Sequence, residues 1–402
     1  MKYDFTTMVD RRGHDSIAVD LQENDFWTLP KGETKPEFDK IPMWIADMNF
    51  PTVPNVTEAI MQRVSHPIYG YFVPSDEYYD AIIKWHKESF DVGDISRQNI
   101  GYENGVLGGI TSALQVLTPV HSPILVHSPT YTGFTTQLER NGYPVVLSKL
   151  CADEKGILRM DYADMEDKIR KHHIHTALLC SPHNPSGRVW EKWELERAMY
   201  LFKKYEVNVI SDEIWSDLAL FGNHHIPTQS ISEDAKQRTI AFYAPSKTFN
   251  LAGLVGSYHV VYNQKLSDEL RRYEVKCHYN DMNVLSMHAL IGAYTPQGRE
   301  WLQQLKQVLE KNIVLADLFF KESVRGVDLR KPEGTYVIVP DFTEWCIQNK
   351  KSLDELLRAG VEVGVLWRDG RQFHSPQGIR MSLGLPTKKL EEVLHRLKKY
   401  VL

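Results

Sequence analysis

The chain has 402 residues, a length that allows two or three domains. Its hydrophobic fraction of 42%, charged fraction of 25% and formal net charge of −5 are typical of a globular protein and do not indicate a nucleic-acid-binding surface. No apolar run approaches the roughly 18–20 residues that a membrane span requires, and the first residues contain no apolar signal segment.

The spacing of the cysteines and histidines argues against a disulfide framework and against a metal site. The four cysteines form neither a CxxC pair nor a disulfide framework, which predicts a reducing, cytoplasmic location: Cys151, Cys180, Cys277 and Cys346. Two histidine groups, at 172–175 and 224–225, have no partner cysteine pair at ligand spacing. We therefore expect no metal site.

The chain divides into three parts in sequence order. Residues 1–50 fit no strand–helix alternation, and we interpret them as an N-terminal arm and small-domain segment. Residues 51–295 alternate short apolar runs with helical patterns, which predicts a large domain of α/β class with a mostly parallel sheet and helices on both sides. Residues 296–402 form the smaller α+β domain together with the arm.

The apolar runs that predict buried strands lie at 124–126, 176–180, 207–210 and 239–242. Between two of them, residues 191–205 repeat apolar side chains on one helical face. In the C-terminal part we expect a long helix at 300–322, strands at 336–339 and 361–363, and a terminal amphipathic helix after Pro386.

Polar side chains follow four of the predicted strands at their carboxyl ends. Tyr131, Asn184, Asp212 and Lys247 each come shortly after an apolar run. Ligands of open parallel sheets bind at this edge, so we expect these four side chains to lie near one rim.

Lys247 and Asp212 each have two interpretations from local sequence. Lys247 precedes an apolar stretch that could desolvate its amine and activate it, but it could also be a surface lysine at a strand end. Asp212 could pair with a protonated heterocycle, or it could cap a helix.

The remaining candidates are also ambiguous when taken singly. Asn184-Pro185 is either a turn or an amide donor, and the glycines at 105, 108 and 109 open a helical pattern that could present amides to a phosphate. Arg380, in a strand-like piece, could bind a carboxylate or form a structural ion pair.

Together, the order and spacing of these residues resemble the fold-type I enzymes that depend on pyridoxal 5′-phosphate (PLP), the aspartate-aminotransferase-like superfamily of class I/II aminotransferases. The resemblance covers essentially the whole chain. It is strongest to the cystathionine β-lyase/C–S lyase branch, through the motifs at 3–5, 44–48, 70–71, 76–78, 180–185, 187–190, 211–214 and 244–250.

The resemblance implies a role for each candidate. Lys247 is expected to hold PLP covalently and to move the substrate Cα proton, while Asp212 pairs with the ring nitrogen. Asn184 donates to the ring oxygen and Tyr131 stacks on the ring. The phosphate is held by Val106, Leu107, Ser246 and, across a homodimer interface, Tyr71 of the neighbouring subunit. Arg380 binds the substrate carboxylate, and the substrate side is expected to include Trp44 and Ala46.

Three positions depart from the family pattern. Trp215 stands where the branch usually has histidine, and an indole can donate one hydrogen bond but accept none. Asn49 replaces a common acid. Val255 stands where many aminotransferases have a phosphate-binding arginine, so amides, hydroxyls and the helix dipole must meet the phosphate charge.

The resemblance implies a PLP-dependent C–S β-lyase that converts a sulfur amino acid of the cystathionine or cysteine type to pyruvate, ammonia and a thiol or sulfide. An L-amino-acid aminotransferase is the alternative, because both reactions share the steps up to removal of the Cα proton. A regulatory PLP-binding protein with little activity is a third possibility, which the presence of Lys247, Asp212 and Arg380 argues against.

Overall fold

The computed structural model describes residues 2–20 and 32–402. The chain forms two compact units. Unit 1 comprises Met1–Pro51, Pro185–Gly187 and Gln303–Leu402, and unit 2 comprises Thr52–Asn184 and Arg188–Leu302. Part of the predicted N-terminal arm, at 1 and 21–31, lies outside the described residues. No helix of the described chain is long and apolar enough to cross a membrane.

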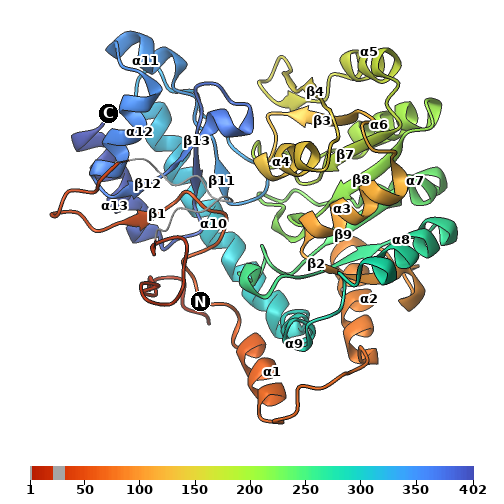
Figure 1. Ribbon diagram of the computed structural model, residues 1–402. Coiled ribbons are helices and arrows are strands. Elements are labelled where there is room, and N and C mark those ends of the chain that lie inside the picture. Colours follow the sequence, from red (N-terminus) through yellow and green to blue (C-terminus); the bar gives the residue numbers. More distant parts are fainter. Residues whose placement is uncertain (1, 21–31) are drawn as a thin grey trace. The chain divides into compact units, whose positions relative to one another are not determined.

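Unit 2 is built around a seven-stranded sheet (Figure 1). In sheet order its strands are β2 (Ile100–Asn104), β10 (Gly256–Val260), β9 (Thr239–Tyr243), β8 (Asn208–Asp212), β7 (Thr176–Cys180), β3 (Ile124–Ser128) and β4 (Val145–Lys149). Strands β4, β3, β7, β8 and β9 pair in parallel, whereas β10 is antiparallel to both of its neighbours. The predicted α/β class with a mostly parallel sheet is confirmed.

The helices of unit 2 cover both faces of this sheet. They are α1 (Pro54–Val64), α2 (Asp76–Phe90), α3 (Val106–Leu117), α4 (Thr132–Arg140), α5 (Tyr162–His172), α6 (Lys192–Lys204), α7 (Glu233–Arg238), α8 (Gln264–Cys277) and α9 (Val284–Ala293). A short hairpin, β5 (Cys151–Ala152) with β6 (Leu158–Arg159), follows β4.

Alternation along the strands explains the two covered faces. On β3, Leu125 packs into a core with α5 and α6, whereas Ile124 and Val126 pack into a second core with α3, α4 and α8. Successive strand residues point to opposite faces, so an unbroken apolar run is what a strand buried on both sides requires.

Unit 1 contains two small sheets. β1 (Ile41–Pro42) pairs in parallel with β12 (Val365–Leu366), and β14 (Ile379–Ser382) lies between β11 (Val337–Ile338) and β13 (Arg368–Asp369). The helices are the C-terminal part of α10 (Pro296–Ser323), α11 (Thr343–Asn349), α12 (Leu353–Glu362) and α13 (Thr387–Tyr400). The predicted long helix, the strand within 336–339 and the terminal helix are all present.

The strand expected at 361–363 is wrong. Val361 is the penultimate position of helix α12, which begins with a reciprocal cap between Ser352 and Glu355. Val361 instead completes the buried face of the helix, and Val363 is the buried C-cap residue that follows it. The chain then turns at Gly364, whose φ is +79°, and β12 follows at Val365.

Candidate active site

Adjacent strands of unit 2 bring the predicted acid and amine together. Asp212 is the last residue of β8, paired with Phe242 of β9, and Lys247 follows β9 by four residues. The Lys247 Nζ atom lies 5.9 Å from the centre of the Trp215 ring, which is buried. The carboxyl ends of these strands therefore place Asp212, Trp215 and Lys247 in one region, as the sheet topology requires.

Burial dominates the electrostatics of Asp212. The loss of solvent raises its pKa from 3.8 to about 7, against the opposing effects of the hydrogen bond from the Ile214 amide and the positive charge of Lys247. The amide of Ile214 donates to Oδ1 at 3.0 Å. A buried carboxylate of this kind is costly unless a cation pairs with it, and a protonated ring nitrogen is such a cation.

Asn184 follows β7, the strand beside β8, and is buried. Its backbone amide donates to the Cys180 Sγ at 3.4 Å, whereas its side-chain Oδ1 is buried without a hydrogen-bond partner among the described residues. A half-turn of the amide places its NH₂ group at the same position, where it could donate to a ligand oxygen. An orphaned buried polar atom is rare, and a bound ligand is one explanation for it.

The predicted phosphate site lies at the start of α3. Gly105 precedes the helix with a φ of +78°, and no side chain caps the helix N-terminus within the described structure. The amides of Val106 and Leu107 belong to the first turn, where backbone N–H groups have no intrahelical acceptor. A phosphate suits this position because it accepts from such amides and interacts favourably with the helix dipole.

The other residues predicted to contact the cofactor occupy different environments. Tyr131 precedes α4, and its ring lies over Gly133, where an added Cβ would approach a ring atom to 2.3 Å. Ser246 is half-buried beside Lys247. Tyr71 is fully exposed, in the segment between α1 and α2.

The predicted substrate-side residues lie together in unit 1. Arg380 is buried on β14, and its Nη1 donates to the backbone carbonyl of Trp44 at 3.4 Å. The Trp44 indole is buried against Val361 and Leu366 and donates to the carbonyl of Ala18, so its ring packs in the core.

Two aromatic side chains that the sequence analysis missed complete this group. The hydroxyl of Tyr336 donates to the Ala46 carbonyl at 3.0 Å, and the Arg380 guanidinium lies 5.0 Å from the centre of the Phe373 ring. The sequence gives no signal for either residue, because each contact depends on how the small strands pair.

Asp217 is another residue that the sequence analysis missed. It is buried just after Trp215 and accepts from the Thr248 hydroxyl at 2.8 Å and from the Trp85 indole at 2.9 Å. This carboxylate therefore links the segment after β8 to the residue next to Lys247. The one sequence feature that could have pointed to Asp217 is its position as an acidic residue in the mainly apolar stretch 214–220.

A buried hydrogen-bond network surrounds Glu213, the residue that follows Asp212. Glu213 accepts from Ser211, the Thr228 amide, the Tyr243 hydroxyl and the His225 ring, at distances of 2.7–3.0 Å. Burial acts to raise the pKa of Glu213, but His225 and these hydrogen bonds outweigh it and hold the pKa below its usual value. His225 thus has a carboxylate partner inside the core.

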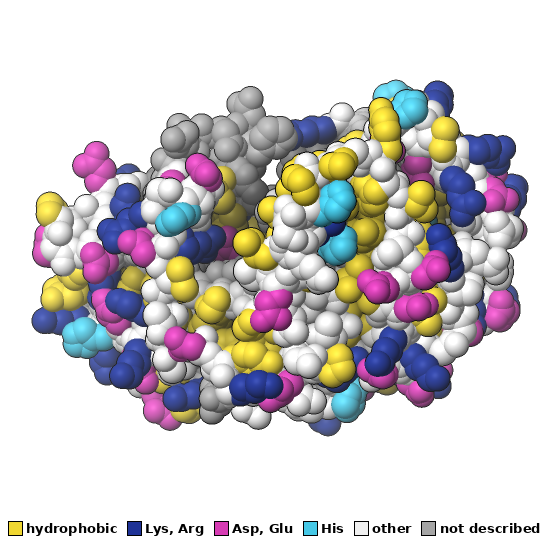
Figure 2. Space-filling model, turned by 90° about the horizontal axis from the view of Figure 1, so that it is seen from below, with side chains coloured by type: hydrophobic (Ala, Val, Ile, Leu, Met, Phe, Trp, Pro, Cys, Tyr) yellow, Lys and Arg dark blue, Asp and Glu magenta, His cyan; other side chains and the backbone are white. Residues whose placement is uncertain are grey.

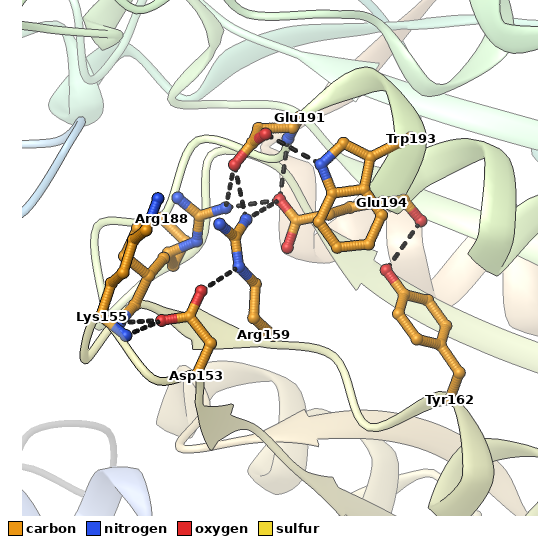
Figure 3. A network of polar contacts seen from close by, with 9 residues as sticks. Asp153, Lys155, Arg159, Tyr162, Arg188, Glu191, Trp193 and Glu194 are labelled. Carbon is orange, nitrogen blue, oxygen red and sulfur yellow. Dashed lines mark hydrogen bonds and ion pairs between the residues drawn. The ribbon is translucent and has the colours of Figure 1, made fainter.

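Figure 3 shows a second network, which anchors the chain after the Asn184 turn. Arg188 is buried and pairs closely with Glu194, whose side chain is 0% exposed, and Arg159 reaches the same carboxylate at 3.1 Å. The carbonyl of Arg188 accepts from the amide of His183, next to Asn184, at 2.8 Å. Figure 3 also includes Glu191 and Asp153, which bind Arg159 at 2.6 and 2.9 Å.

Among the described residues, neither histidine group, at 172–175 or 224–225, belongs to a set of three possible metal ligands, although His225 contacts the Glu213 carboxylate. Within the described residues one other group of possible metal ligands is close: Glu103, His259 and Glu274, with ligand atoms within 4.8 Å of one another. His259 Nδ1 lies 2.7 Å from a Glu103 oxygen, a hydrogen bond within the group. The expected absence of a metal stays a prediction.

The chain can now be compared with known proteins. A family model described as aminotransferase class I and II matches residues 39–397. The chain belongs to this family. Cystathionine beta-lyase PatB of Bacillus subtilis is 31% identical over 367 residues, which cover 90% of this chain and 92% of PatB.

Two solved structures extend the comparison. A PLP-bound protein of Clostridium difficile 630, named provisionally as an aminotransferase, is 32% identical over the full length of both chains, with a TM-score of 0.90. The PLP-bound C–S lyase of Staphylococcus hominis is 26% identical over 98% of each chain, with a TM-score of 0.87.

These similarities confirm the predicted superfamily, its cystathionine β-lyase/C–S lyase branch and PLP as the cofactor. The candidate site residues of unit 2 are suited to hold PLP. A buried carboxylate suits a pyridinium nitrogen, Asn184 has an unsatisfied buried atom, the first turn of α3 suits a phosphate, and Lys247 supplies an amine.

Proposed function

We propose that this protein is a PLP-dependent C–S β-lyase that eliminates a thiol or sulfide from a sulfur amino acid of the cystathionine or cysteine type. The observation that carries the proposal is the grouping of Lys247, Asp212 and Trp215 at the strand ends of a fold shared with a cystathionine beta-lyase and a C–S lyase.

Each candidate site residue of unit 2 has a proposed role. Lys247 would hold PLP through its amine and would also remove the Cα proton of the substrate. Asp212 keeps the ring nitrogen protonated, Asn184 donates to the ring oxygen, and Trp215 and Tyr131 pack against the ring. Val106, Leu107 and Ser246 hold the phosphate. When bound, PLP supplies an electron sink for the substrate Cα.

Lys247 accepts the proton from Cα, the Cβ–S bond breaks, and the sulfur leaves with the bonding electron pair as a thiolate. The remaining 2-aminoacrylate takes up water to give pyruvate and ammonia. Lys247 would suit this transfer, because the lysine that holds PLP would remain close to the bound substrate and its amine can accept a proton. Arg380 of unit 1 is proposed to bind the substrate carboxylate through its planar guanidinium, with Ala46 and the backbone of Trp44 on the substrate side, because the Trp44 ring packs in the core.

We also propose a homodimer in which Tyr71 reaches the phosphate bound by the neighbouring subunit. The support is an exposed apolar segment: Met61, Ile68, Tyr69, Tyr71 and Val73 are each more than half exposed. Figure 2 views the protein from below and shows hydrophobic side chains at the surface of that face. A second copy of the chain would cover such a patch.

The four cysteines are all free thiols, two of them exposed, which supports a reducing, cytoplasmic location for this enzyme.

The products test the reaction. Purified protein supplied with L-cystathionine or L-cysteine is expected to release pyruvate together with a thiol or sulfide, without any added keto acid. An aminotransferase would instead require a keto acid and form a new amino acid in equal amount. The dimer is tested by separating dimer from monomer by sedimentation and assaying pyruvate production in each fraction. The Tyr71→Phe variant is expected to remain a dimer but to bind PLP more weakly. A fully active monomer would contradict the shared site.

A further inference from the structure

The first turn of α3 has little intrinsic rigidity. It begins after Gly105, whose φ of +78° suits glycine, and contains Gly108 and a second glycine immediately after it. Glycine inside a helix lowers its stability relative to alanine. The preceding strand, β2, lies at the edge of the sheet, and β10 is its one partner strand among the described residues. Contacts from another part of the chain are therefore needed to fix this turn if it is to bind a phosphate.

The loop between α8 and α9 supplies the missing support. The Tyr279 hydroxyl donates to the Asn104 carbonyl at 3.1 Å, and the Asn104 side-chain amide donates in return to the Tyr279 carbonyl. The side chain of the next residue, Asn280, accepts a hydrogen bond from the backbone amide of Asn104 at 3.4 Å and donates one to the Glu103 carboxylate at 2.8 Å. Two consecutive loop residues thus grip the last two residues of β2, directly before Gly105.

Tyr279 also lies against the turn itself. A Cβ added to Gly108 would approach the Tyr279 Oη to 2.2 Å and two of its ring carbons to 2.9 Å. The absence of a side chain at 108 is therefore what allows the phenol to reach Asn104. Burial, with the negative charge of Glu103, raises the pKa of Tyr279, so the phenol stays protonated and can donate at neutral pH.

We propose that Tyr279 is a positioning residue for the cofactor phosphate: its phenol, seated on Gly108 and bonded to Asn104, fixes the first turn of α3 so that the Val106 and Leu107 amides converge on the phosphate. This inference rests on the proposed phosphate site at that turn. Tyr279 itself need not touch the cofactor, because it acts through the backbone at 104–108.

The inference predicts an effect on the phosphate and not on the ring. We would remove the cofactor and compare the affinity of the apoenzyme for PLP and for pyridoxal, which lacks the phosphate. Loss of one neutral hydrogen bond corresponds to a roughly fivefold effect. Tyr279→Phe is expected to weaken PLP binding about fivefold while leaving pyridoxal binding unchanged. Tyr200→Phe, at an exposed tyrosine on α6, is the control and should change neither.

Gly108 provides a second, independent test through a double-mutant cycle. Gly108→Ala alone should displace the phenol and weaken PLP binding. In a Tyr279→Ala background there is no ring to displace, so Gly108→Ala should have little further effect. Equal losses in both backgrounds would show that the glycine serves the phosphate directly and would overturn the role of Tyr279.

The outcomes separate this inference from the proposed site. If the unmodified protein binds PLP no better than pyridoxal, the phosphate site at α3 is wrong. If it prefers PLP strongly and Tyr279→Phe keeps that preference in full, the site stands and the positioning role of Tyr279 fails. An equal fall in both affinities would indicate a general structural role, which also contradicts the inference.

Discussion

Replacement of Asp212 by asparagine should affect stability and activity in opposite directions. In the apoenzyme, burial raises the pKa of this carboxyl to about 7, whereas the unfolded chain ionises near 3.8. The folded protein therefore retains a proton over this interval that the unfolded chain has released. For an acid whose pKa is raised by folding, stability falls as pH rises from about 4 to above 7. Asparagine, which is neutral throughout, escapes this loss.

The size of the effect follows from the same two values. They differ by about 3, and each pKa unit corresponds to 1.36 kcal/mol, so ionising Asp212 in the folded apoenzyme costs at most roughly 4 kcal/mol at pH 8. Relative to the unmodified apoenzyme, Asp212→Asn should gain unfolding free energy progressively between pH 4 and pH 8. With PLP bound, the same variant loses the partner of the ring nitrogen and should release pyruvate far more slowly.

Urea unfolding of both apoproteins at several pH values measures this difference. Asp167→Asn, at an exposed carboxyl on α5, is the control and should show no comparable trend. A difference between Asp212→Asn and the unmodified protein that stays constant from pH 4 to pH 8 would refute the claim that burial sets the charge state of Asp212.

Three further predictions concern the supporting residues. Glu194→Gln removes the closest ion-pair partner of buried Arg188 and should cost about 3–5 kcal/mol in urea unfolding, whereas Glu196→Gln, in an exposed pair with Lys192, should cost under about 1 kcal/mol; similar losses would contradict the role of burial. Tyr243→Phe removes a donor to buried Glu213 and should cost about 1–3 kcal/mol, an effect absent from Tyr200→Phe. Arg380→Lys should raise the KM for the amino-acid substrate at least about tenfold with a smaller change in kcat, because a lysine cannot grip a carboxylate with two parallel hydrogen bonds; an unchanged KM in initial-rate assays would exclude Arg380 from substrate binding.

The parts of the fold that depend on local pattern were predictable. Buried strands such as β7 and β8 read as short apolar runs, and the polar residues after them, Asn184 and Asp212, lie at neighbouring strand ends because parallel strands align their carboxyl ends. The antiparallel strand β10 and the strand β12 were not predicted. β10 reads Gly-Ser-Tyr-His-Val and so contains no apolar run, and β12 has only two residues, so both depend on pairing partners far away in the sequence, which local composition does not reveal.

The supporting residues of the site were harder to predict for the same reason. Asp217 and Glu213 look like ordinary acids in sequence, and their importance comes from partners such as Trp85 and His225, which lie on other elements. Tyr279 is a comparable case, since its link to Asn104 joins residues 175 positions apart.

The central claim is that Lys247 holds PLP, and chemical trapping tests it directly. Borohydride reduces the carbon–nitrogen double bond that links PLP to an amine and makes the link permanent, so peptide mass spectrometry can then locate the cofactor. The account predicts a single modified peptide with the added mass on Lys247, and loss of both this peptide and the visible absorption band in Lys247→Ala. A modified lysine elsewhere, or an unmodified Lys247 in protein that has bound PLP, would contradict it.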